Sequence, residues 1–444
     1  MRRLVIDNGA VLTCDGEDRY LARGRIVVRG GRIAQVMDSP DGRADVPGAP
    51  PGGVADEDCD RVDAGGCIII PGLVNCHTHL WLSLLRGALD DLTLFPWLRR
   101  LGPLTNELSD AEVLRATYFG IAESLLSGTT CLCECCRYAP DVSAQVAAAL
   151  GCRLVVGGMP PTELFGAPLP HDYGHLVART RRALDIPGGD RGLISVWMGA
   201  HSVYNCSADF LQDAKRAADM HDCDFYIHLA ECRDEVDVIR ERYGRTPVQY
   251  AADLGLLDRR TVAVHCVWLT DDDIRLFRRT GARMAHCPVS NAKLGSGVAP
   301  VTRYRAAGIT VGLGTDSMVS NNTLSMFQEM RFAVLIQRAV RQDVALTASD
   351  ALRMATIEAA RTLGLEREIG SIESGKQADL VLLRSTRPGP VTKERALSDV
   401  VYAAQRDEIE AVYVAGERVV SRGRLTRLAD TERWERIRGE RPLE

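Results

Sequence analysis

Hydrophobic and polar residues alternate near both ends of this chain, and in the middle the hydrophobic residues gather into short runs. The alternation near the N-terminus predicts β-strands at 4–6, 10–13, 24–29 and 32–37, with Gly30-Gly31 at a hairpin turn. The same pattern returns at 378–383, 409–415 and 418–420. Because chain ends often lie close together, we expect both ends to build one small β-sandwich domain.

The middle of the chain repeats a strand followed by a helix. Short β-branched runs predict eight strands, at 68–75, 129–133, 153–157, 194–199, 225–229, 262–266, 283–286 and 310–314. Helix-length stretches lie between them, including 110–126, 207–220, 247–254 and 271–279. This pattern is typical of βα units around a closed parallel barrel. An open doubly wound sheet is the alternative, but no Gly-x-Gly-x-x-Gly follows an early strand.

We therefore predict an α/β fold, a (β/α)8 TIM-like barrel with a small β-sandwich domain built from both chain ends. The barrel is expected to span 68–371, and residues 1–67 and 372–444 are expected to form the two parts of the β-sandwich.

Composition indicates a globular protein with a small-molecule partner. The 444 residues are 46% hydrophobic and 25% charged, which is enough for a large core. A net charge of -5 with scattered arginines points to neither a nucleic-acid nor a membrane partner. The chain shows neither a long apolar run nor the pattern of a signal peptide, so we expect a cytoplasmic protein with reduced thiols.

Candidate chemistry gathers where the predicted barrel strands end. His77 and His79 end the first apolar run, and residues i and i+2 of a strand share one face, so both can bind one ion. A His-x-His pair alone is as typical of two structural histidines. The ends of later strands add four further polar residues: His228, Glu231, His265 and Asp316. Since barrel enzymes place their chemistry at this edge, one shared site explains the pattern best.

Cys131, Cys133 and Cys135 alternate along one predicted strand, and thiolates bind zinc well. A matching cysteine pair is missing elsewhere in the sequence. We expect these cysteines to act as small buried hydrophobic residues, with a thiolate metal site as the alternative.

At this point the chain resembles the amidohydrolase superfamily, in the branch that includes S-adenosylhomocysteine deaminase, guanine and cytosine deaminases, and the triazine hydrolases. The matching segments are PGLVNCHTHLWLSLLRG, IHLAE, VHC, HCPVSNAKLGSGVAP, GLGTDS with SNN, and GSIESGKQADLVLL. They extend from residue 68 to residue 383 and are specific to the branch, not to one substrate.

The resemblance implies one divalent metal ion per chain, held by His77, His79, His228 and Asp316, with zinc as the first choice and iron as the alternative. Binuclear relatives carry a bridging carboxylated lysine at the end of strand four. Here that strand ends in Met198-Gly199-Ala200-His201. This difference favours attack on an unsaturated ring carbon over hydrolysis of a saturated cyclic amide.

The implied reaction is metal-dependent hydrolytic deamination of an N-heterocyclic aromatic amine, of purine, pyrimidine, pterin, simple nucleoside or triazine type. Metal-bound hydroxide would attack the ring carbon and ammonia would leave. Glu231 would carry a proton to a ring nitrogen, His265 would orient the hydroxide, and Asp316 would act as ligand and base. Glu231 could instead stabilise a helix N-terminus. Two further alternatives are removal of chloride or an alkylamine from a triazine-like ring, and a non-catalytic scaffold of the same superfamily.

The resemblance also implies substrate contacts by Trp97, His201 and Thr105. Thr105 or Asn106 stands where nucleoside deaminases have a glutamate that binds the ribose, and Glu107 reaches that place only by a shift. Gly157 stands where that group has an arginine for the homocysteine end. We therefore expect a compact heterocycle or simple nucleoside to be preferred over S-adenosylhomocysteine. The resemblance allows a homo-oligomer.

Overall fold

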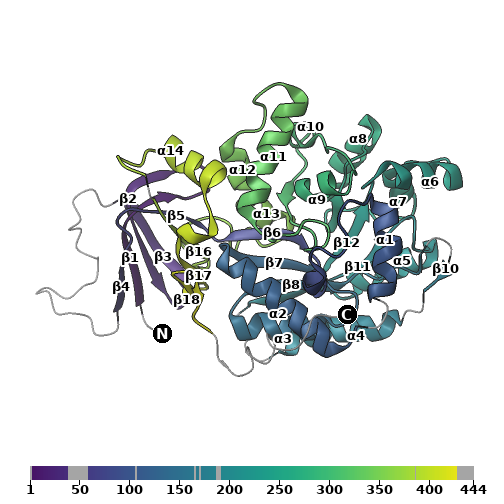
Figure 1. Ribbon diagram of the computed structural model, residues 1–444, viewed down its shortest axis with the longest axis horizontal. Coiled ribbons are helices and arrows are strands. Elements are labelled where there is room, and N and C mark those ends of the chain that lie inside the picture. The colour runs from purple at the N-terminus through teal and green to yellow at the C-terminus, as the bar shows by residue number, and fades with distance from the viewer. Residues whose placement is uncertain are drawn as a thin grey trace, which may run out of the picture.

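The computed structural model describes residues 3–38, 59–105, 108–164, 167–169, 172–186, 192–385 and 387–427. It shows a parallel barrel beside a mixed sheet that contains strands from both ends of the chain (Figure 1). The predicted α/β fold, a TIM-like barrel with a smaller domain from the chain ends, is confirmed.

The eight strands of the barrel are all parallel and follow one another in chain order around the sheet. They are β6 (Leu73–Thr78), β7 (Thr129–Cys135), β8 (Arg153–Gly158), β11 (Ile194–Ser202), β12 (Asp224–Leu229), β13 (Thr261–His265), β14 (Arg283–His286) and β15 (Val311–Leu313). The last strand returns to the first, since the backbone N–H of Asp316 donates to the carbonyl of His77 at 2.9 Å. The chain segments after β6 and β15 are therefore neighbours.

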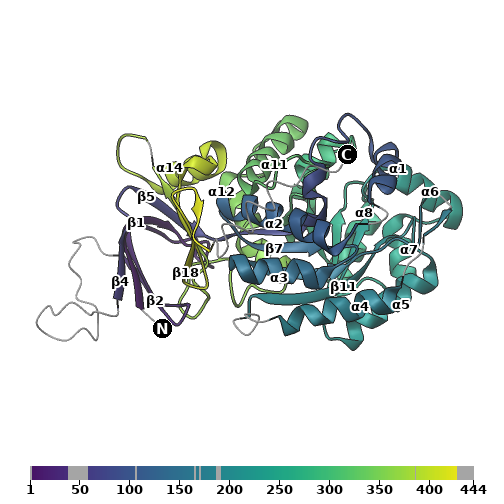
Figure 2. The same ribbon diagram turned by 60° about the horizontal axis from the view of Figure 1, so that its bottom comes forward.

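Helices cover the outside of the barrel (Figure 2). They are α1 (Leu94–Thr105), α2 (Asp110–Leu126), α3 (Pro140–Leu150), α4 (Tyr173–Arg182), α5 (Ala208–Met220), α6 (Arg233–Tyr243), α7 (Pro247–Asp253), α8 (Asp271–Thr280), α9 (Pro288–Lys293), α10 (Val301–Ala306), α11 (Met326–Arg341), α12 (Ala348–Met354) and α13 (Ile357–Thr362), with a short 3-10 turn η1 (Leu80–Leu85) after β6. Ser109 and Glu112 form a capping box that starts α2. Among the described helices, none has both the length and the apolar character needed to span a bilayer.

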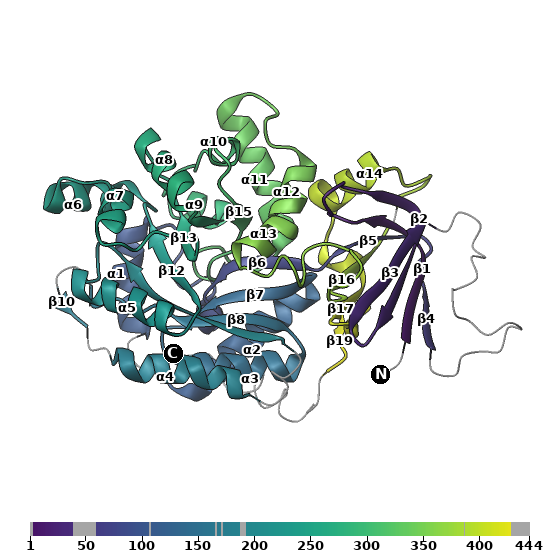
Figure 3. The same ribbon diagram turned by 180° about the vertical axis from the view of Figure 1, so that it is seen from behind.

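The smaller domain is a nine-stranded sheet in which strands from the first and last parts of the described chain lie side by side (Figure 3). Its strands are β1 (Arg3–Leu12), β2 (Tyr20–Arg29), β3 (Arg32–Asp38), β4 (Cys59–Asp63), β5 (Cys67–Pro71), β16 (Leu380–Arg384), β17 (Ile409–Val414), β18 (Glu417–Ser421) and β19 (Arg424–Leu425), joined by α14 (Lys393–Ser398) between β16 and β17. β5 pairs with β1 on one side and β16 on the other. Ile6, Ile26, Ile69 and Leu382 are buried in its core.

The apolar run 68–75, predicted as one barrel strand, divides at Gly72. Its first half is β5 of the smaller sheet, and its second half opens β6 of the barrel. A Cβ atom at Gly72 would lie 2.1 Å from Thr130 Oγ1, so glycine at this position leaves room for the Thr130 side chain. The predicted domain limits, 67/68 and 371/372, stay a prediction.

Candidate active site and metal centre

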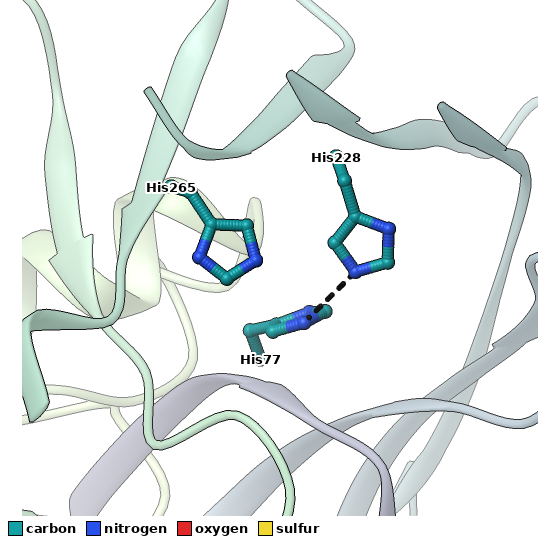
Figure 4. A group of neighbouring side chains, drawn as sticks. All are labelled: His77, His228 and His265. Atoms are coloured by element: carbon teal, nitrogen blue, oxygen red, sulfur yellow. Dashed lines mark hydrogen bonds between the residues drawn. The ribbon is translucent and has the colours of Figure 1, made fainter. Parts of the chain in front are cut away.

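Barrel strands bring the predicted metal-binding side chains together at one end of the barrel. His77 lies near the end of β6, His228 is on β12 and His265 ends β13, and their rings face one another (Figure 4). The Nε2 atoms of His77 and His228 are 3.2 Å apart. Asp316, which follows β15, places Oδ1 3.7 Å from His77 Nε2 and 3.5 Å from His79 Nε2. The four predicted ligands therefore lie close together, and the ring centres of His79 and His228 are 5.5 Å apart.

The outer nitrogens of two imidazoles are held by backbone carbonyls. His79 Nδ1 is 3.0 Å from the carbonyl oxygen of Cys135, and His228 Nδ1 is 2.9 Å from that of His201. Because a carbonyl only accepts, Nδ1 carries the proton in both rings and Nε2 presents its lone pair to the centre.

Burial, followed by the neighbouring His79, holds the pKa of His77 well below its usual range. Burial also lowers the pKa values of His79 and His228. Among the described residues, the ligand atoms of His77, His79 and Asp316 lie within 4.8 Å of one another, as do those of His77, His228 and His265. Neutral imidazoles and one carboxylate are a donor set that suits a divalent ion such as zinc.

Asp316 is fixed as a carboxylate. Ser290 Oγ donates to its Oδ2 at 2.6 Å, and the backbone N–H of Ser317 donates to Oδ1 at 2.8 Å. Although burial acts in the opposite direction, His79 and His77 hold the pKa of Asp316 below its usual range. Its φ of 61° lies in the left-handed region, which for a non-glycine residue is a strained conformation of the kind that occurs at functional sites.

Glu231 and His265 form a second polar pair on the wall of the same site. Glu231 Oε2 is 3.6 Å from His265 Nε2. The Nδ1 atom of His265 is 2.8 Å from Asn291 Oδ1, so this ring is also oriented from behind. Burial, then the charges of Asp316 and Glu235, raise the pKa of Glu231 well above its usual range.

The alternative role for Glu231, stabilisation of a helix N-terminus, is taken by another residue. Glu235 accepts hydrogen bonds from the backbone N–H groups of Ala230 and Glu231 at 3.0 and 2.7 Å. Ala230 has a φ of 51°, so the chain turns sharply after β12. After this turn Glu231 lines the same pocket as the candidate ligands His79, His228 and Asp316.

One pocket lies over these residues, and it also contains the three predicted substrate contacts. Trp97 and Thr105 line it from α1, and His201 lines it from the end of β11. His201 Nδ1 is 3.0 Å from the amide nitrogen of Asn205, which leaves Nε2 as the protonated nitrogen. Burial, then the neighbouring His79, lower the pKa of His201 to about 3. His201 is thus a neutral hydrogen-bond donor.

Trp97 and Thr105 differ in what they can offer a ligand. The indole N–H of Trp97 is buried and has no hydrogen-bond partner among the described residues. The Thr105 hydroxyl donates to the Leu101 carbonyl at 3.0 Å, within its own helix. Asn106 and Glu107, the alternative ribose contacts, lie outside the described residues.

Several polar residues of the site were not identified from the sequence, among them Asn205, which lines the pocket beside His201. Ser290 and Asn291 support Asp316 and His265 from α9, within the HCPVSN segment. Arg137 lines the pocket two residues beyond the end of β7. Its position directly after a predicted strand was a signal that could have drawn attention to it.

The predicted cysteine alternation is seen in β7, where Cys131, Cys133 and Cys135 are all buried. They pack against Cys76 and Cys287 in the barrel interior. Cys135 Sγ lies 3.2 Å from His77 Nδ1, so one of these thiols contacts a candidate metal ligand from behind.

The comparisons with known proteins agree with this site. The model of the Amidohydrolase family matches residues 68–419. A 5-methylthioadenosine/S-adenosylhomocysteine deaminase of Desulforudis audaxviator is 38% identical over 437 residues, which are 97% of this chain and 96% of that protein. A 5'-deoxyadenosine deaminase of Methanopyrus kandleri is 37% identical over 369 residues, 82% of this chain and 84% of that protein.

A solved structure gives the same result. The crystal structure of an adenosine deaminase from Xanthomonas campestris with bound zinc has a TM-score of 0.86 and 33% sequence identity, and the match covers 98% of this chain and 99% of that one. The chain is therefore an enzyme, a hydrolase acting on C–N bonds, and it belongs to the amidohydrolase family.

Proposed function

We propose that this protein hydrolytically deaminates adenine-type nucleosides with the help of a divalent metal ion. One observation carries the proposal: Glu231 lines the same pocket as His79, His228 and Asp316, three of the four candidate metal ligands, and the fourth, His77, lies 3.2 Å from His228 between their Nε2 atoms. The chain that builds this pocket is 38% identical over 437 residues to a protein named as a 5-methylthioadenosine/S-adenosylhomocysteine deaminase.

His77, His79, His228 and Asp316 would hold the ion, with zinc as the first choice and one ion per chain. The ion would supply Lewis acidity that makes a water molecule nucleophilic at neutral pH. The fit rests on the lone pairs of His79 and His228 Nε2, which the carbonyls of Cys135 and His201 turn toward the centre.

Glu231 would move the proton. Its Oε2 atom can accept a proton from the attacking water and deliver it to the ring nitrogen next to the carbon under attack. His265 Nε2, 3.6 Å away, can orient that water, because Asn291 fixes the ring through Nδ1. Asp316 can accept the second proton and pass it to the departing amine. The balance is one water consumed and one ammonia released, with an oxo group in place of the ring amine.

Trp97 and His201 would position the heterocycle. Both residues line the pocket and each carries a ring N–H without a partner among the contacts described above, and adenine carries ring nitrogens that accept hydrogen bonds. Thr105 would contribute its methyl group and helix end more than its hydroxyl, since the hydroxyl is already engaged.

The test is ammonia release by the purified, zinc-loaded protein. Adenosine, 5'-deoxyadenosine and methylthioadenosine are offered beside guanine, cytosine and an aminated triazine, and products are identified by mass. We expect stoichiometric ammonia and the corresponding oxo product from at least one adenine nucleoside. Metal-loaded protein that deaminates guanine, cytosine or the triazine but no adenine compound would contradict the proposal.

A further inference from the structure

Arg137 lines the pocket. Among the described lining residues it is the one basic residue besides the histidines. It follows β7 by two residues and is half-buried. Its guanidinium carbon lies 5.2 Å from the centre of the Tyr138 ring. Among the described residues no carboxylate forms an ion pair with Arg137, although arginines elsewhere in this chain commonly have acidic partners, as Arg153 and Arg179 do.

The surroundings of Arg137 hold its side chain near one end of the pocket. Tyr138, on which it stacks, donates its hydroxyl to the carbonyl of Thr105 at the end of α1. The Tyr138 ring also meets Trp81 edge to face, with 5.4 Å between ring centres. Because Trp81 and Thr105 themselves line the pocket, the stacked guanidinium belongs to its wall.

Two acidic side chains line the pocket among the described residues. Glu231 and Asp316 are its lining carboxylates, and both belong to the metal centre. The wall that α1 provides is largely apolar, with Leu94, Leu98 and Leu101. A ring bound at the candidate metal centre would share this pocket with the apolar side chains of α1 and with a guanidinium that has no ion-pair partner among the described residues.

We propose that Arg137 binds an anionic group, a phosphate or a carboxylate, on the substituent that extends from the adenine ring of the substrate. This inference rests on the proposed function and narrows it to nucleosides with a negatively charged tail. A guanidinium offers paired N–H donors that match the oxygens of either anion. A zwitterionic tail suits the wall less well, because its ammonium group would find no carboxylate there among the described residues. We therefore still expect S-adenosylhomocysteine to be a poorer substrate than a nucleoside with a simple anionic tail.

The experiment compares kcat/KM for four substrates on the zinc-loaded enzyme: adenosine, adenosine 5'-monophosphate, adenosine 5'-carboxylic acid and S-adenosylhomocysteine. We expect one of the two simple anions to exceed both adenosine and S-adenosylhomocysteine, and the better anion identifies the group. In Arg137→Gln, the ratio of kcat/KM for that anion to kcat/KM for adenosine should fall about tenfold to a hundredfold, the range for a hydrogen bond to a charged group. Arg137→Lys should retain part of the preference, since it keeps the charge and loses the paired geometry.

Arg233 provides a matched control. Its guanidinium also stacks on an aromatic ring, 4.1 Å from the centre of Trp268, but it is exposed and does not line the pocket. Arg233→Gln should leave the substrate ratio unchanged. An unchanged ratio in Arg137→Gln, or a wild-type enzyme that prefers adenosine to both anions, would overturn the inference.

A binding measurement separates this inference from the proposed function. Calorimetry with inosine and inosine 5'-monophosphate, the deaminated forms, requires no turnover. If the protein binds the phosphate form more tightly in an Arg137-dependent way but releases no ammonia, the anion site stands and the deaminase proposal falls. If ammonia is released but Arg137→Gln does not change the ratio of kcat/KM for the anion to kcat/KM for adenosine, the deaminase proposal stands and the anion site falls.

Discussion

The two ends of the pocket are built in different ways. At the metal end, side chains are braced from behind: His79 and His228 by carbonyls, His265 by Asn291, and Asp316 by Ser290. Elsewhere on the pocket wall, α1 presents leucines and the Arg137 guanidinium stacks on the Tyr138 ring. The side chains of the metal site are oriented by hydrogen bonds and can hold one fixed reaction geometry. The α1 wall has fewer such hydrogen bonds, so its side chains can change without loss of that geometry. We infer that the first end sets the chemistry and the second sets the substrate.

Removal of the metal should have the largest effect. Chelation is expected to lower activity on every substrate by at least about 10⁴-fold, because water is no longer activated. Added zinc should restore activity, and elemental analysis should find one ion per chain. Two ions per chain, or full activity without metal, would contradict the mononuclear site.

Glu231→Gln should have the next largest effect. The substitution keeps the shape of the side chain but removes the group that moves the proton, so kcat should fall about 10²-fold to 10⁴-fold with the metal still bound. Asp234→Asn, an exposed carboxylate three residues away, is the matched control and should be unaffected. An active Glu231→Gln enzyme would remove Glu231 from the mechanism.

Asn291→Ala tests whether the hydrogen bond that orients His265 is needed for activity. Loss of the acceptor at His265 Nδ1 should lower kcat about 10-fold to 100-fold, the range for residues that orient a site from behind. Asn291→Asp keeps an acceptor and should recover most of the activity. If both variants lose the same activity and melt at the same lowered temperature, Asn291 serves the fold and not His265.

Trp97→Phe should have the smallest effect and belongs to the other end of the pocket. It removes one N–H donor and keeps an aromatic face, so KM should rise about 2-fold to 10-fold while kcat changes little. Steady-state kinetics with adenosine measure both. A large fall in kcat with unchanged KM would mean that Trp97 takes part in the chemical step.

The metal end could be anticipated because its residues occur at strand ends. In a parallel barrel all strand ends meet at one face, so His77, His228, His265 and Asp316 had to converge once the strands were recognised. The His-x-His spacing and the Glu231 position, three residues after His228, needed only local geometry. The resemblance to amidohydrolases added the assignment of roles, and the family match confirms that resemblance.

Other features depended on contacts between distant residues. The run 68–75 has no internal signal for its division at Gly72, because the first half is defined by pairing with β16, more than three hundred residues away along the chain. The bracing of His265 by Asn291 depends on where α9 packs. Arg137 became a pocket residue only when the end of β7 was placed against the end of α1, through Tyr138 and Thr105.

Periodicity and strand-end chemistry are properties of short segments, and the sequence alone was therefore enough to predict the barrel and to propose a metal site at its strand ends. Three features depend on which surfaces meet after packing. They are the pairing of distant strands, the hydrogen bonds that orient each candidate ligand, and the presence of the Arg137 charge in the pocket. Only the tertiary structure decided these, because a side chain such as Arg137 has the same local sequence whether it faces solvent or a substrate.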